Sequence, residues 1–123
     1  TELSDILFRS PRPLSGRANL GVFKDDQVNI GVHGHVPVLS DMIAQVAGDP
    51  EIIKYAQSKG AKGIVVAGIC CTALESLMRR GMPVAGNFLQ QELAIITGAL
   101  EMLIVDLQCV MPSLPNIASY FHT

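Results

Sequence analysis

The stretch Gly63-Ile64-Val65-Val66-Ala67-Gly68-Ile69-Cys70-Cys71-Thr72 decides the fold class. Residues 63–69 are apolar without interruption, which is typical of a strand that is covered on both faces of a parallel sheet. Two cysteines follow at once. The segment 72–80 then has a helical pattern, which Gly81 ends. A strand, a polar or reactive residue and a helix, in this order, form one structural unit.

The same unit recurs on both sides of this stretch. Further strands are predicted over 28–32, 83–86 and 102–107, and further helices begin at Pro37 or cover 50–59, 89–100 and 112–121. In the helix that begins at Pro37, the apolar residues fall on one face: Val38, Leu39, Met42, Ile43 and Val46. In the helix over 50–59, the residues expected to face inward are Ile52, Ile53, Tyr55 and Ala56. Strands that alternate with helices predict an α/β fold, a Rossmann-like parallel sheet of about four strands with helices on both faces.

The domain organisation is predicted from where the regular pattern starts. Residues 1–26 form an N-terminal segment in which prolines and glycines break any regular element beyond a short helical turn over 4–9. Residues 27–123 form one domain. The chain begins without Met and ends on Tyr120-Phe121-His122-Thr123, so we expect it to be a fragment of a longer chain.

Composition excludes several classes of function. The 123 residues are 49% hydrophobic and 5% aromatic, with 9 basic and 11 acidic side chains. Such a chain has no polycationic face and few stacking rings, so no nucleic-acid partner is expected. The longest apolar stretch, 93–107, is interrupted by Glu101 and Asp106, so no transmembrane segment is expected. Three cysteines, two of them adjacent, favour reduced thiols and a cytoplasmic location.

Reactive side chains gather at one edge of the predicted sheet. Ligands of open parallel sheets bind at the carboxyl ends of the strands, and each predicted strand is followed there by such residues: His33 and His35, Cys70 and Cys71, Asn87, and Cys109. Taken singly, a cysteine after a strand is more often a small buried hydrophobe. Together, thiols and imidazoles suit zinc or iron–sulfur chemistry. Neighbouring side chains diverge, so we expect only one of the adjacent cysteines to bind. A nucleophilic pair of Cys71 with His35 is the less favoured alternative.

Several strings, in this order, carry a resemblance to a known family. They are His33-Gly34-His35-Val36-Pro37-Val38-Leu39-Ser40, Gly63-Ile64 with Gly68-Ile69-Cys70-Cys71-Thr72, Leu77-Met78-Arg79-Arg80-Gly81, Gln91-Glu92 with Thr97-Gly98-Ala99, and Asp106-Leu107-Gln108-Cys109 with Pro112. Over residues 27–123 the chain resembles the anaerobic nickel-containing carbon monoxide dehydrogenases, as one central Rossmann-like domain of the catalytic subunit.

The resemblance implies an oxidoreductase that converts CO and water to CO₂, two protons and two electrons, with a nickel–iron–sulfur cluster as cofactor. His35 resembles the histidine ligand of the iron outside the cubane, Cys71 the cysteine ligand of the same iron, and Cys109 a cysteine ligand of the cubane. The family's remaining ligands come from other parts of the chain. We therefore expect the isolated segment to be inactive and its cluster site to be incomplete.

The resemblance also implies a homodimer and a ferredoxin-like electron acceptor, and leaves open an acetyl-CoA synthase partner and the roles of Cys70 and His33. The sequence departs from the family at Ala73-Leu74, where Gly-Asn is common, and at Arg80, where His is common. Two other hypotheses stay open: a non-catalytic metal-binding or docking module, and a relative of the hybrid-cluster proteins.

Overall fold

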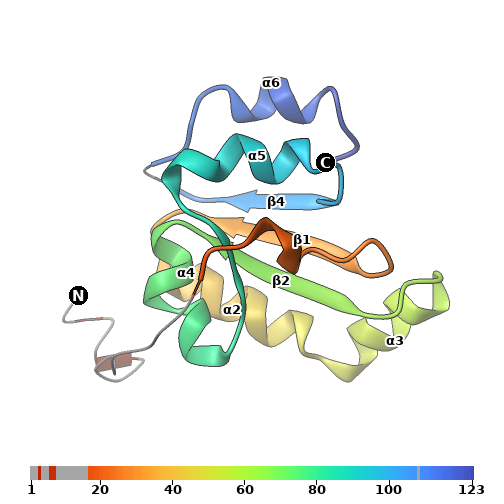
Figure 1. The fold of residues 1–123 in the computed structure, drawn as a ribbon. Coiled ribbons are helices and arrows are strands. Elements are labelled where there is room, and N and C mark those ends of the chain that lie inside the picture. The colour runs from red at the N-terminus through yellow and green to blue at the C-terminus, as the bar shows by residue number, and fades with distance from the viewer. Residues whose placement is uncertain (1–2, 4–5, 8–16, 108) are drawn as a thin grey trace.

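The computed structural model describes residues 3, 6–7, 17–107 and 109–123. In this part of the chain four strands form one sheet in the order β3-β2-β1-β4, and all paired strands run parallel. The strands are β1 (Val28–His33), β2 (Ile64–Ile69), β3 (Val84–Gly86) and β4 (Met102–Val105). The predicted parallel sheet is confirmed (Figure 1). The helical turn expected over 4–9 falls largely outside the described residues.

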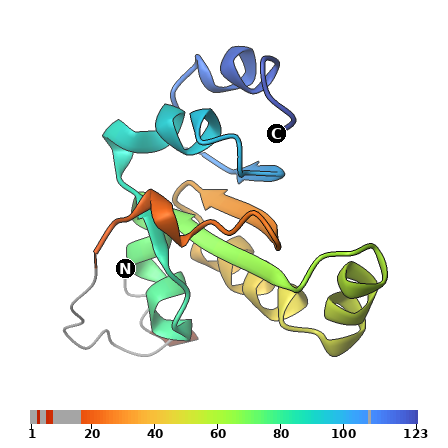
Figure 2. The same cartoon turned by 45° about the vertical axis from the view of Figure 1, so that its right-hand side comes forward.

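Helices cover both faces of the sheet, as predicted. On one face lie α2 (Pro37–Ala47), α3 (Pro50–Ser58) and α4 (Cys71–Glu75); on the other lie α5 (Gln91–Ile96) and α6 (Leu114–Ala118) (Figure 2). Short 3-10 turns complete the described elements: η1 (Leu20–Val22), η2 (Leu77–Arg80) and η3 (Phe88–Gln90).

The aliphatic core is divided by the sheet because successive strand residues point to opposite faces. Val66 of β2 packs with α2 and η2, whereas its neighbour Ala67 packs with α5 and β3. A third cluster of Ile95, Leu100 and Leu114 joins α5 to α6.

Arg80 of η2 also forms an ion pair with Asp41 of α2, and this carboxylate raises the pKa of Arg80.

Several helices are shorter than predicted. The helix expected over 72–80 breaks at Ser76 into α4 and η2, and the Ser76 hydroxyl donates to the Thr72 carbonyl at 3.3 Å. Such back-bonding competes with the regular helical pattern. The helix expected over 89–100 divides into η3 and α5, and Gly98, with φ +70°, follows its end. The last helix and the last strand are also shortened, to 114–118 and 102–105.

The apolar residues predicted to share one face of α2 largely do so, whereas the inward side predicted for α3 is partly wrong. In α2 the buried residues are Ser40 and Ala44, while a row of large apolar side chains is exposed: Val38, Leu39, Met42 and Val46. In α3, Ala56 is buried as predicted but Ile52 and Tyr55 are exposed. Leu39, Met42, Ile43 and Val46 of α2 line one apolar groove, and Ile43 also packs against the core.

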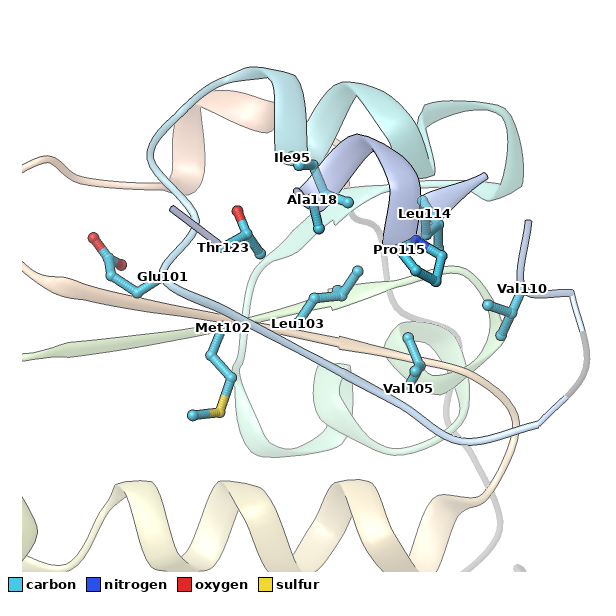
Figure 3. Close-up of a pocket in the computed structure, with 10 residues that line it drawn as sticks. All are labelled: Ile95, Glu101, Met102, Leu103, Val105, Val110, Leu114, Pro115, Ala118 and Thr123. Atoms are coloured by element: carbon cyan, nitrogen blue, oxygen red, sulfur yellow. The ribbon is translucent and has the colours of Figure 1, made fainter. Parts of the chain in front are cut away.

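Two apolar hollows border β4. One, of about 320 Å³, lies beside α2 and includes Met42, Val46 and Ile104 in its lining; we call it the α2 groove. The other, of about 270 Å³, lies between β4 and α6, where Leu103 points toward Leu114 and Pro115 while Met102 points away (Figure 3). None of the described helices has the length and apolar character needed to cross a membrane.

Candidate metal centre

The strand order reverses between β1 and β4, which makes this the switch point of the sheet. The chain moves from β1 outward through β2 to β3, and then returns to place β4 on the other side of β1. The connections leaving β1 and β4 therefore diverge to opposite faces at their carboxyl ends, and ligands of open α/β sheets bind there. The arrowheads of β1 and β4 point to this carboxyl edge in Figure 1.

Asp106, the first residue after β4, holds the loop after β1. Its carboxylate accepts hydrogen bonds from the backbone N–H groups of His35 at 2.7 Å and Val36 at 2.8 Å. Gly34 has φ +142°, and a Cβ there would lie 1.6 Å from the Asp106 Oδ1 atom. The glycine is therefore required for the carboxylate to reach the loop. These bonds fix the backbone of His35, the predicted histidine ligand, to the end of β4.

The same loop is joined to the start of α4. The Thr72 N–H donates to the Gly34 carbonyl at 3.0 Å, and the buried hydroxyls of Thr72 and Ser40 lie 3.1 Å apart. His35 and Cys71 are each one residue away from this backbone bond. Gly68 allows α4 to lie this close, because a Cβ at Gly68 would come within 2.4 Å of the Ala73 Cβ.

The loop after β4 is held by two buried side chains. His33 places its Nε2 atom 3.1 Å from the Cys109 carbonyl oxygen, and Gln91 donates to the same oxygen from Nε2 at 2.6 Å. Both side chains are almost fully buried. The loops that carry the three predicted ligands are thus joined by hydrogen bonds at one edge of the sheet.

Two cysteines have unusual backbone conformations. Cys70 (φ +63°) and Cys109 (φ +55°) are the only described non-glycine residues with positive φ. Such conformations cost about 1–3 kcal/mol each and persist where the surrounding structure imposes them, often at functional sites. The Cys70 N–H donates to the Gly86 carbonyl at 3.0 Å, and its half-buried side chain packs against the core.

The predicted ligands lie at the carboxyl edge but do not form a compact group. His35 and Cys71 are half-buried, and Cys109 is exposed. Within the described residues no three side chains of His, Cys, Asp or Glu are arranged to hold one metal ion. Asn87 has a structural role, since its side chain caps η3 by accepting from the Leu89 N–H at 3.0 Å.

Sequence reasoning misses two contributors to this edge, Asp106 and Gln91, which enter the sequence analysis without a role at the site. It places His33 at the edge but leaves its role open. The only available signal was position, because Asp106 and His33 stand directly at the ends of strands. The partners of these side chains lie too far away along the chain to be recognised from local sequence.

An open doubly wound α/β sheet with cysteines and histidines at its switch point defines a class of ligand-binding domain. Comparison with known proteins identifies the family within this class. The chain belongs to the Prismane/CO dehydrogenase family, whose model matches residues 1–123. Carbon monoxide dehydrogenase 1 of Methanosarcina mazei is 58% identical over the whole chain, and that of Carboxydothermus hydrogenoformans is 56% identical. The chain spans only 20% and 19% of the lengths of these two relatives.

Solved structures agree over nearly the whole chain. A nickel-free crystal structure of carbon monoxide dehydrogenase from Thermococcus sp. AM4 matches 98% of the chain, and the chain covers 19% of it, with a TM-score of 0.91 and 58% identity. An acetyl-CoA synthase/carbon monoxide dehydrogenase structure, described with NiZn[Fe4S4] and NiNi[Fe4S4] clusters, matches 98%, and the chain covers 18% of it, with a TM-score of 0.89 and 50% identity.

Proposed function

We propose that this chain is one segment of a longer carbon monoxide dehydrogenase, and that it contributes His35, Cys71 and Cys109 as ligands of a nickel–iron–sulfur cluster. The observation that carries the proposal is the joining of three loops at the carboxyl edge of the sheet. Asp106 binds the backbone of His35, Thr72 binds Gly34, and both His33 and Gln91 bind the Cys109 carbonyl. The named relatives support the activity.

The donor set fits such a cluster by its chemistry. Thiolates are the usual ligands of iron–sulfur clusters, and histidine replaces some of them in known cases. The ligands of a cluster bind different metal atoms, so they need not form the compact group that a single ion requires. Further ligands would come from other parts of the polypeptide. When bound, the cluster supplies the redox chemistry by which CO and water become CO₂, two protons and two electrons.

This segment's own contribution is to place and orient ligands. The hydrogen bonds from Asp106 fix the backbone of the His35 loop, and the close packing of Gly68 against Ala73 fixes the start of α4 beside it. Ligand atoms held in this way require less reorganisation when metal binds, which favours affinity and a defined geometry.

We further propose the family's assembly for the whole protein. This comprises a homodimer, a ferredoxin-like electron acceptor and a cytoplasmic location. Three cysteines, two of them adjacent, do not suit a framework of disulfides, which supports a reducing compartment. An acetyl-CoA synthase partner is named for one similar structure and is proposed only as an optional partner.

Ligand substitution in the full-length polypeptide tests the proposal. We expect the wild-type protein, produced without oxygen and with iron and nickel supplied, to contain both metals and to reduce a viologen dye in the presence of CO. His35→Ala and Cys71→Ala should each reduce this rate to background and lower the nickel content. His122→Ala is the matched control, because the His122 side chain is 56% exposed and lies away from the carboxyl edge, 3.9 Å from Glu101.

Each result has a defined meaning. A wild-type polypeptide without nickel and without CO-dependent dye reduction would overturn the enzyme assignment and favour the docking module. Full activity in His35→Ala or Cys71→Ala would overturn the ligand assignment of that residue alone.

A further inference from the structure

We infer that Gln91, assisted by His33, is a positioning residue that fixes the Cys109 thiol for the metal cluster. The inference rests on the proposed function, because it takes Cys109 as a ligand. It assigns a role to two buried polar side chains that contact no predicted ligand atom themselves.

Gln91 holds both sides of the short turn that contains Cys109. Its Nε2 atom donates to the Cys109 carbonyl at 2.6 Å, and its Oε1 atom accepts from the Met111 N–H at 2.9 Å. Since one partner is an acceptor and the other a donor, the orientation of the amide is fixed by the contacts. The side chain is 0% exposed. The Gln91 amide therefore bonds to a carbonyl and an N–H of this turn, as the backbone of a neighbouring strand would.

His33 contacts the same carbonyl. Its Nε2 lies 3.1 Å from the Cys109 oxygen, while its Nδ1 lies 3.4 Å from the carbonyl oxygen of Ile69 at the end of β2. Both partners are carbonyl oxygens, so the tautomer of His33 determines which of them accepts. The Cys109 carbonyl thus lies within hydrogen-bond distance of two side chains on different elements.

These contacts act on the direction of the thiol through the backbone. Cys109 has φ +55°, a backbone conformation that an L-residue adopts where its surroundings impose it. The Gln91 bonds to the Cys109 carbonyl and the Met111 N–H, with the His33 contact beside them, hold this conformation. The carbonyl is turned inward by them, and the side chain is left exposed at the carboxyl edge. If Gln91 no longer donates, the residue can relax and the thiol changes direction.

The test uses the full-length polypeptide loaded with iron and nickel. Gln91→Glu keeps the shape and the acceptor for the Met111 N–H, but a carboxylate cannot donate to the Cys109 carbonyl. Gln91→Met removes both contacts without burying a charge. Gln90→Glu is the matched control: the Gln90 Oε1 accepts from the Asn87 N–H at 3.0 Å, which a carboxylate can also do.

Two readouts besides activity are measured. We expect a chelator to remove iron about tenfold faster from both Gln91 variants than from the wild type, as is typical when a group that supports a metal ligand is lost. We also expect their electron paramagnetic resonance spectra to be altered, because one thiolate has moved. Circular dichroism should show a folded protein, and Gln90→Glu should match the wild type in both readouts.

The outcomes separate this inference from the proposed function. A wild-type protein that binds no cluster overturns the proposed function. A wild type with a cluster, together with Gln91→Glu and Gln91→Met proteins whose iron loss and spectra are unchanged, overturns the positioning role alone. If Gln91→Glu does not fold, the result for Gln91→Met decides.

Discussion

Gly34 occupies a backbone position where a side chain and the Asp106 carboxylate would take the same space. Gly34→Ala would bring a Cβ to 1.6 Å from Asp106 Oδ1 at φ +142°. We expect a loss of about 2 kcal/mol or more in the free energy of unfolding, because the substitution adds backbone strain and breaks charge-assisted hydrogen bonds. Urea unfolding of the 123-residue chain measures this loss.

Gly60→Ala is the control for this substitution. Gly60 also has positive φ, at +100°, but a Cβ there meets nothing within 4 Å. It should cost only about 1 kcal/mol, which is the strain alone. Equal losses in the two variants would show that the contact with Asp106 contributes nothing.

Individual residues differ in how well the sequence predicts their roles. The strand-end positions of His35, Cys71 and Cys109 follow from apolar runs that end just before them. The roles of Asp106 and Gln91 do not follow from such runs, because each side chain acts on a backbone group contributed by a distant segment. A polar residue in a loop or at a helix start also has many ordinary explanations. Their roles depend on a register that only the folded sheet defines.

Among the elements, α4 is positioned by its close approach to β2. Gly68→Ala would place a Cβ 2.4 Å from the Ala73 Cβ and 2.6 Å from its Cα, so the backbone of α4 must move. We expect a destabilisation of about 1–3 kcal/mol, as for overpacked cores. Because Cys71 begins α4, nickel retention by the full-length protein should also fall. Thermal unfolding and metal analysis measure the two effects.

The control lies on the approach to the same strand. Gly63→Ala would bring its Cβ no closer than 3.4 Å to a Gln27 side chain, which is an ordinary contact. This variant should unfold and retain nickel like the wild type. Normal nickel retention in a folded Gly68→Ala protein would contradict the link between the α4 packing and the ligand.

At the level of elements, periodicity predicts that a helix exists more reliably than it predicts which side is buried. The apolar spacing of α2 correctly indicates a helix. The buried residues of α2 are nevertheless Ser40, which bonds to Thr72, and Ala44, which packs with Val66. The larger apolar residues stand at the border of the groove, a distinction that hydrophobicity alone does not make.

For the whole molecule, the α2 groove predicts self-association of the isolated 123-residue chain. Met42 and Val46 are each 57% exposed, and contiguous apolar surface of this kind promotes association in water. Val46→Lys should shift the chain toward the monomer in sedimentation velocity experiments and lower the binding of an apolar dye. Gln45→Lys adds a positive charge to the same helix outside the groove lining, so it should have little effect. Equal shifts would indicate a general effect of charge.

The hydrogen bonds that close the His35 loop also determine when it can form. They join residues 71 and 70 positions apart, because Asp106 accepts from the backbone N–H groups of His35 and Val36. During translation, a nascent chain that has emerged only as far as α5 carries His35 and Cys71 but none of the groups that close this loop from β4. The loop after β1 can therefore adopt its final conformation only once the chain has been synthesised as far as Asp106.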